Sequence, residues 1–185
     1  TDTADMTMAL IFSIPRKLRE VHEEMQSGSW KVWSPSAMIG MRITGKKLGI
    51  LGMGRIGQAI AKRAKAFDLD INYHNRRRLH QNIEESLSAT YWENLEEMLS
   101  KIDILVVSAS LNPSSLYLLN AKCLRKMKQT AYLVNISRGE IIDQKALVRQ
   151  LKDGQLGGAG LDVYDSEEII GSDFKNLKNV FLLPH

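Results

Sequence analysis

Short runs of continuously apolar residues alternate along this chain with segments in which apolar residues recur at helical spacing. The apolar runs predict buried strands at 46–51, 70–74, 103–107, 131–136, 158–163 and 180–183. The segments between them predict helices at 58–67, 84–87, 95–101, 121–127 and 144–153. Apolar strands that alternate with helices are typical of a parallel sheet covered on both faces. The predicted fold class is therefore α/β, with a doubly wound parallel sheet.

The first 28 residues follow a different pattern, because they predict one long helix over about 4–25. Pro15 lies inside this helix and either kinks it or divides it into two pieces, and Gly28 ends it. The stretch 6–14 has few polar residues, so it needs burial against another surface. That surface is either the core of the same domain or an interface with a second domain or subunit, and the sequence leaves both open.

One junction between a predicted strand and a predicted helix is rich in glycine. The strand at 46–51 runs directly into the pattern Gly52-x-Gly54-x-x-Gly57, and the helix follows. A dinucleotide pyrophosphate needs this order: the first glycine makes a tight turn, the second lets the backbone approach phosphate, and the third lets the helix pack on the strand. The helix N-terminus adds free N–H groups and a partial positive charge. We therefore expect a Rossmann-type dinucleotide-binding domain. The alternative is a tight turn that binds no ligand.

Composition narrows the class of protein and of partner. The chain has 185 residues, of which 44% are hydrophobic, enough for one domain with a core. Its net charge is +4, but basic and acidic residues interleave, so no nucleic-acid-binding stripe forms. The longest apolar stretch, 8–14, is too short to span a membrane. The single cysteine, Cys123, fits a reducing compartment, so we expect a cytoplasmic protein that binds no nucleic acid, membrane or metal.

The residues after the strand at 70–74 bear on the choice between NAD and NADP. Domains that bind NAD commonly carry an acidic residue there, which accepts a hydrogen bond from the ribose 2′-hydroxyl. This chain has Asn75 and Arg76 instead. A guanidinium beside a neutral amide attracts a 2′-phosphate, so these residues favour NADP. The alternative is that the three arginines at 76–78 form a solvated loop and that Asn75 binds the two ribose hydroxyls of NAD.

Four charged or titratable residues follow other predicted strands. Arg138 follows the strand at 131–136, Asp162 lies near the end of the strand at 158–163, Glu167 comes five residues later, and His185 follows the last strand. Ligands of parallel sheets bind at the carboxyl ends of the strands. Each residue alone has an ordinary explanation, such as a surface ion pair or a loop contact. Together at one edge of a sheet they indicate a catalytic crevice.

With these residues the chain resembles the nucleotide-binding domain of the D-isomer-specific 2-hydroxyacid dehydrogenases. The motifs that carry the resemblance cover nearly the whole chain: Thr3-Ala4-Asp5, Gly45-Lys46, the glycine motif, Asn112-Pro113-Ser114-Ser115, Met127-Lys128, Arg138-Gly139, 158–163 and Leu183-Pro184-His185. Within that family, the segment Tyr73-His74-Asn75-Arg76 is similar to glyoxylate and hydroxypyruvate reductases.

The resemblance implies a role for each residue at the strand ends. Arg138 would hold the substrate carboxylate and polarise the 2-oxo group. His185 would deliver a proton to the carbonyl oxygen as hydride arrives from the nicotinamide, and Glu167 would hydrogen-bond His185 and keep it protonated. Asp162 would contact the nicotinamide end of the cofactor. The cofactor contacts expected in all are Gly52, Gly54, Arg55, Ile56, Gly57, Asn75, Arg76, Ser108, Asn112, Ile136 and Asp162.

The resemblance also implies an organisation larger than this chain. Residues 1–185 would form one NAD(P)-binding domain, with the substrate domain of the family outside them. The helix within 1–28 would join the two domains and lie in a homodimer interface. The reaction implied is hydride transfer between NADPH or NADH and a small 2-oxo acid, glyoxylate or hydroxypyruvate above all. Two alternatives stay open: a dinucleotide-sensing corepressor or scaffold of the same fold, and a phosphoglycerate or formate dehydrogenase.

Overall fold

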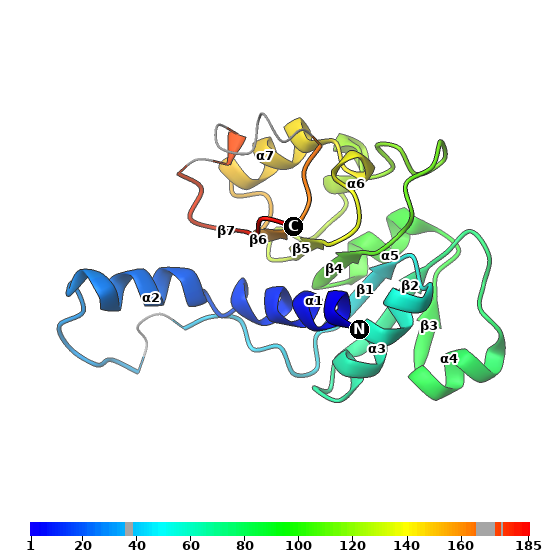
Figure 1. Cartoon of the computed structure of the whole chain (residues 1–185), viewed down its shortest axis with the longest axis horizontal. Helices are drawn as coiled ribbons and strands as arrows, with labels where there is room; N and C mark the ends of the chain where they lie inside the picture. The colour runs from blue at the N-terminus through cyan, green and yellow to red at the C-terminus, as the bar shows by residue number, and fades with distance from the viewer. Residues whose placement is uncertain (36–38, 166–172, 175) are drawn as a thin grey trace.

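The fold is built on one sheet of parallel strands (Figure 1). The structure, a computed structural model, describes residues 1–35, 39–165, 173–174 and 176–185. Within these residues the strand order is β3-β2-β1-β4-β5-β6-β7, and every pairing is parallel. The strands are β1 (Lys47–Leu51), β2 (Asp70–His74), β3 (Ala89–Tyr91), β4 (Ile104–Val107), β5 (Tyr132–Asn135), β6 (Gly158–Leu161) and β7 (Val180–Leu182). The α/β prediction, with a doubly wound parallel sheet, is confirmed.

Helices connect the strands at positions close to those that the sequence predicts. They are α1 (Asp2–Ser13), α2 (Leu18–Ser27), α3 (Arg55–Lys65), α4 (Gln81–Leu87), α5 (Leu95–Lys101), α6 (Ala121–Leu124), the 3-10 helix η1 (Gly139–Ile141) and α7 (Gln144–Lys152). Side-chain caps fix three of the starts, because Asn94 accepts from the amide of Glu97, Asn120 from the amides of Lys122 and Cys123, and Asp143 from the amide of Ala146. The sequence did not reveal β3, a three-residue edge strand whose residues are only partly buried or exposed.

Alternate positions of the central strands enter two separate cores. In β1, Leu48 and Ile50 pack with α1 and α3, whereas Leu51 faces α5, α6 and α7. In β4, Ile104 and Val106 belong to the first core, and the two residues that alternate with them belong to the second. Because both faces of the sheet are buried, its central strands have no polar face, and this is why they are continuously apolar in the sequence.

The N-terminal segment divides at Pro15 and gives two helices with different surroundings. Helix α1 packs beside α3, with Leu10 and Ile11 buried, and Arg63 of α3 pairs with Asp5 at 2.5 Å. Burial of the inward face of the apolar stretch 6–14 is therefore intramolecular. Helix α2 begins after Lys17, which has a φ of 54°, and ends at Gly28. It extends away from the sheet as an arm (Figure 1).

Two properties of the described residues bear on the predicted partners. No helix among them has both the length and the apolar composition needed to cross a membrane. In the same part of the chain, no three histidine, cysteine, aspartate or glutamate side chains lie together in a way that could hold a metal ion.

Candidate functional site

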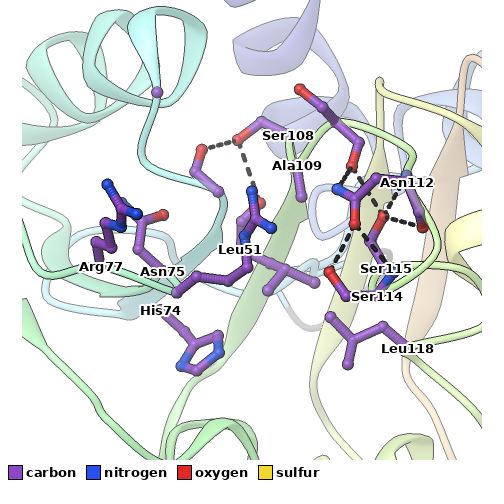
Figure 2. Close-up of a pocket in the computed structure, with 14 residues that line it drawn as sticks. Leu51, His74, Asn75, Arg77, Ser108, Ala109, Asn112, Ser114, Ser115 and Leu118 are labelled. Atoms are coloured by element: carbon purple, nitrogen blue, oxygen red, sulfur yellow. Dashed lines mark hydrogen bonds between the residues drawn. The ribbon is translucent and has the colours of Figure 1, made fainter.

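The strand order reverses at β1, which pairs with β2 on one side and with β4 on the other. Ligands of open α/β sheets bind outside the carboxyl ends of the strands at such a point. A cavity of about 650 Å³, here called the switch-point cavity, lies there. Its walls come from the segments that follow β1, β2 and β4 (Figure 2): Leu51, Gly52, Gly54, His74, Asn75, Arg76, Arg77, Ser108, Ala109, Ser110, Asn112, Ser114, Ser115 and Leu118.

The three glycines after β1 meet three different surroundings. Gly52 has a φ of 99°, and a Cβ atom on it would lie 2.5 Å from the backbone of Ala109. A Cβ atom on Gly57 would lie 2.5 Å from the carbonyl oxygen of Gly52, so this glycine lets α3 pack against the turn. A Cβ atom on Gly54 would meet no atom within 4 Å. The turn and the helix packing thus require Gly52 and Gly57, whereas Gly54 leaves open space at the wall of the cavity.

Hydrogen bonds tie the glycine loop to the strands on both sides. On the β2 side, the amide of Gly52 donates to the carbonyl of His74 at 3.1 Å, and the amide of Met53 donates to Oδ1 of Asn75 at 2.7 Å. On the β4 side, the hydroxyl of Ser108 donates to the carbonyl of Gly52 at 2.7 Å. Because Met53 engages Oδ1 of Asn75, the Nδ2 amide of this side chain is the group left for a ligand. It is a hydrogen-bond donor.

The far wall of the cavity is a loop held together by its own side chains (Figure 2). Oδ1 of Asn112 accepts from the amide and the hydroxyl of Ser114, at 3.0 and 2.6 Å. The hydroxyl of Ser115 accepts from the amide of Asn112 at 2.9 Å and donates to the carbonyl of Ser110 at 2.8 Å. Asn112 therefore shapes this wall. Both of its side-chain polar atoms are engaged within the loop, since Nδ2 donates to Ser110.

The three arginines after β2 do not all face the cavity. Arg76 and Arg77 line it, and Figure 2 shows Arg77 and Asn75 on its β2 side. Arg78 instead pairs with Glu84 of α4 at 2.8 Å. The hydrogen bonds from Arg78 and Tyr73 hold the pKa of the Glu84 carboxyl below its usual range. Burial and the bond to Glu84 raise the pKa of Tyr73 to about 12.

A second cavity, also of about 650 Å³, lies at the ends of β5, β6 and β7. It is lined by Arg138, Gly139, Glu140, Val163, Tyr164, Leu182, Leu183, Pro184 and His185. The fold thus brings together two of the three predicted catalytic residues, Arg138 and His185. The third, Glu167, lies outside the described residues. We call this second space the strand-end cavity.

Five of the predicted cofactor contacts line neither cavity, and one of them is Gly57, which is buried in the first turn of α3. Arg55 and Ile56 begin α3 and are exposed. Ile136 is 8% exposed and packs in the core on the α1 and α3 side. Asp162 is partly exposed directly after β6, and its amide donates to the carbonyl of Asn135 at 3.0 Å.

Two residues that the sequence analysis did not single out position the strand-end cavity. Asn135, a buried amide, donates to the carbonyl of Arg138 at 3.0 Å and accepts from the amide of Ser137 at 3.1 Å, which shapes the turn that carries Arg138. The hydroxyl of Tyr164 donates to the carbonyl of Leu183 at 2.6 Å and holds the segment that leads to His185. Burial raises the pKa of the Tyr164 phenol. A polar residue at the end of an apolar strand was the available signal for Asn135.

Comparisons with known proteins agree with this geometry. A family model described as "D-isomer specific 2-hydroxyacid dehydrogenase, NAD binding domain" matches residues 8–185. A glyoxylate reductase from Thermococcus kodakarensis is 42% identical over 187 aligned positions, which are 99% of this chain and 56% of that protein.

Solved structures give the same result. A protein from a Polaromonas species, described as a D-isomer specific 2-hydroxyacid dehydrogenase, superposes with a TM-score of 0.93 and 40% identity, covering 99% of this chain and 57% of that one. A glyoxylate reductase from Paecilomyes thermophila has a TM-score of 0.89 and 37% identity, with 99% and 54% covered. The chain therefore spans about half the length of the relatives it matches.

The different surroundings of Gly54 and Gly57 lead to a paired prediction. Gly54→Ala adds a methyl group in open space, so the free energy of unfolding should change by less than about 1 kcal/mol. The same methyl would occupy the space that a pyrophosphate needs, and dinucleotide affinity should fall at least about tenfold. Gly57→Ala should cost about 1–3 kcal/mol of stability, because its methyl meets a backbone carbonyl. Urea unfolding and fluorescence titration with NADPH measure both effects. Normal binding by Gly54→Ala would place the pyrophosphate elsewhere.

Proposed function

Because this chain belongs to the D-isomer specific 2-hydroxyacid dehydrogenase family, we propose that it is the nucleotide-binding domain of a reductase that converts a small 2-oxo acid to a 2-hydroxy acid. The substrates we propose are glyoxylate and hydroxypyruvate. The observation that carries this proposal is that Arg138 and His185 line one cavity at the carboxyl ends of β5, β6 and β7. The name of the relative from Thermococcus kodakarensis, a glyoxylate reductase, supports the choice of substrate.

The residues of the switch-point cavity fit a dinucleotide. Gly54 leaves room for the pyrophosphate next to the N-terminus of α3, where free amides and the helix dipole favour an anion. When bound, the cofactor supplies the hydride for the reaction. Arg138 would bind the substrate carboxylate through its planar guanidinium and orient the 2-oxo group. His185 would donate a proton to the carbonyl oxygen as negative charge develops there. Glu167 would hydrogen-bond His185 and favour its protonated form.

We further propose a preference for NADP over NAD. A 2′-phosphate presents only acceptor oxygens and negative charge at neutral pH. Arg76 and Arg77 line the cavity where β2 ends, and the free polar group of Asn75 is an amide donor. These three side chains suit a phosphate better than they suit a pair of hydroxyls.

The arm suits a homodimer interface, which we propose as the assembly of the whole protein. Every residue of α2 is at least partly exposed, with Met25 58% exposed. The segment after it exposes Trp30, Val32 and Trp33, the last by 73%. Exposed apolar side chains on a projecting helix and on the segment that follows it are typical of a surface that a partner covers.

The proton-donor role is tested with His185→Gln in the full-length protein. Glutamine keeps a hydrogen-bonding side chain of similar size but has no titratable group. Turnover of glyoxylate with NADPH should fall at least about a hundredfold, while the Kd for NADPH should stay within about twofold. Steady-state rates and fluorescence titration give the two numbers. Near-normal turnover would make His185 structural. A wild-type protein that binds NADPH tightly but turns over no small 2-oxo acid would favour the corepressor or scaffold alternative.

Arg76→Ala tests the cofactor preference. The variant should bind NADPH about tenfold more weakly, because a charged hydrogen bond to the 2′-phosphate is lost. Its affinity for NADH should hardly change, since NADH has no phosphate at that position. Equal losses for both cofactors would contradict the assignment of Arg76 to the 2′-phosphate.

The proposed dimer is tested with substitutions in the arm and in the segment that follows it. Trp33→Asp combined with Met25→Glu should convert the dimer to a monomer, because each charge would be buried at the interface without a partner. Light scattering after gel filtration of the full-length protein measures the mass. Leu116→Asp, which changes a 49% exposed leucine in a loop remote from the arm in sequence, is the control. A dimer that persists in the double variant would exclude the arm as its main interface.

A further inference from the structure

We propose that Tyr73, Glu84 and Arg78 form a clamp that positions Arg76 and Arg77 for the cofactor 2′-phosphate, and that Arg78 itself does not bind the phosphate. The proposal rests on the NADP preference proposed above and deepens it. It divides three consecutive arginines, which look alike in the sequence, into two ligand-binding residues and one positioning residue.

The centre of the clamp is the carboxylate of Glu84, which is 7% exposed on α4. Arg78 reaches it with a two-pronged contact, Nε at 3.0 Å from Oε1 and Nη2 at 2.8 Å from Oε2. The hydroxyl of Tyr73, a fully buried residue of β2, donates to Oε1 at 2.5 Å. A buried carboxylate with three charge-assisted or short hydrogen bonds fixes its partners in one geometry.

The clamp holds both ends of the short segment that carries the other two arginines. At its far end, the amide of Leu79 donates to the hydroxyl of Tyr73 at 3.0 Å. At its near end, the hydroxyl of Tyr91 in β3 donates to the carbonyl of Asn75 at 3.4 Å. The guanidinium of Arg78 lies 5.5 Å from the centre of the Tyr91 ring, which joins the two ends.

Between these two fixed ends lie Arg76 and Arg77, and both line the switch-point cavity, whereas Arg78 does not. A loop that is already ordered presents its guanidinium groups without the entropic cost of fixing them at each binding event. Arg78, paired with Glu84, does not contribute a third guanidinium to the lining of the cavity. Strand β3, which the sequence did not reveal, supports the clamp because it carries Tyr91.

Simple electrostatics and the clamp predict opposite signs for the same change. Glu84→Gln removes a negative charge near a phosphate site, so charge alone would tighten the binding of NADPH. If the clamp positions the arginines, Glu84→Gln weakens NADPH binding, because a neutral amide holds the guanidinium of Arg78 and the phenol of Tyr73 less firmly than a carboxylate does. Glu85→Gln is the matched control. Glu85 is the next residue of α4, is exposed, and accepts from Gln81 rather than from any residue of the clamp.

The experiment titrates the full-length protein and its variants with NADPH, NADH and adenosine 2′-monophosphate, using fluorescence and calorimetry. Glu84→Gln should raise the Kd for NADPH and for the 2′-monophosphate about tenfold and leave the Kd for NADH within about twofold. Arg78→Lys keeps the positive charge but loses the two-pronged contact with Glu84, so it should raise the Kd for NADPH to the same extent. The side chain of Arg78 is 64% exposed, so we expect Arg78→Lys to fold even if Glu84→Gln does not. Turnover at saturating NADPH should stay unchanged in both.

Each of the other outcomes would overturn one of the proposals made above. NADPH binding that is unchanged or tighter in Glu84→Gln and unchanged in Arg78→Lys would overturn the clamp while leaving the proposed function intact. Loss in Arg78→Ala with full retention in Arg78→Lys would mean that Arg78 acts through its charge on the phosphate. Equal losses for NADPH and NADH would make the clamp a general support of the fold. A wild-type protein that binds NADH but not NADPH would overturn the cofactor preference and the clamp together, and one that binds neither would overturn the proposed function.

Discussion

The whole site depends on the close approach of two backbone segments, at Gly52 after β1 and at Ala109 after β4. A side chain on Gly52 would meet the Ala109 backbone at 2.5 Å, and its φ of 99° would strain any other residue. The two segments touch where the paired strands β1 and β4 end and the strand order reverses, and the hydroxyl of Ser108 bridges the two segments. After β1 the chain continues to α3 on one face of the sheet, and after β4 it continues to α6 on the other face. The switch-point cavity lies where these two connections separate.

Polar side chains around this junction act mainly as supports. Asn75 holds the amide of Met53, Asn112 holds its own loop, and Asn135 holds the turn before Arg138. Each satisfies backbone groups in a segment that follows a strand, where the ladder of the sheet has stopped and leaves donors and acceptors unpaired. The arginines and His185 are then carried on segments that are already fixed. Because these segments are already fixed, a ligand that binds the charged groups does not have to offset the entropic cost of ordering the loops.

Much of the site was predictable because the carboxyl ends of parallel strands share one edge. The apolar runs located six of the strands, and the residues after them supplied Gly52, Asn75, Arg138 and His185. Contacts within the loops were not predictable, because they join residues whose distance in space depends on how the loops turn. Asn112 and Ser108 therefore line the cavity with side-chain polar groups that already bond to the protein, and Arg78 pairs with Glu84 instead of lining the cavity. The short strand β3 had no apolar run to reveal it.

The sequence by itself determined the fold class, the family and the edge of the sheet at which the two cavities lie, since periodicity and the glycine motif are local in the chain. Only the tertiary structure decided which two of the three arginines line the switch-point cavity and that Pro15 separates a buried helix from an exposed arm. The physical reason is the same in both cases. Charge and hydrophobicity are properties of a residue, whereas the partner that satisfies them, such as Glu84 for Arg78, comes from an element that packs beside it.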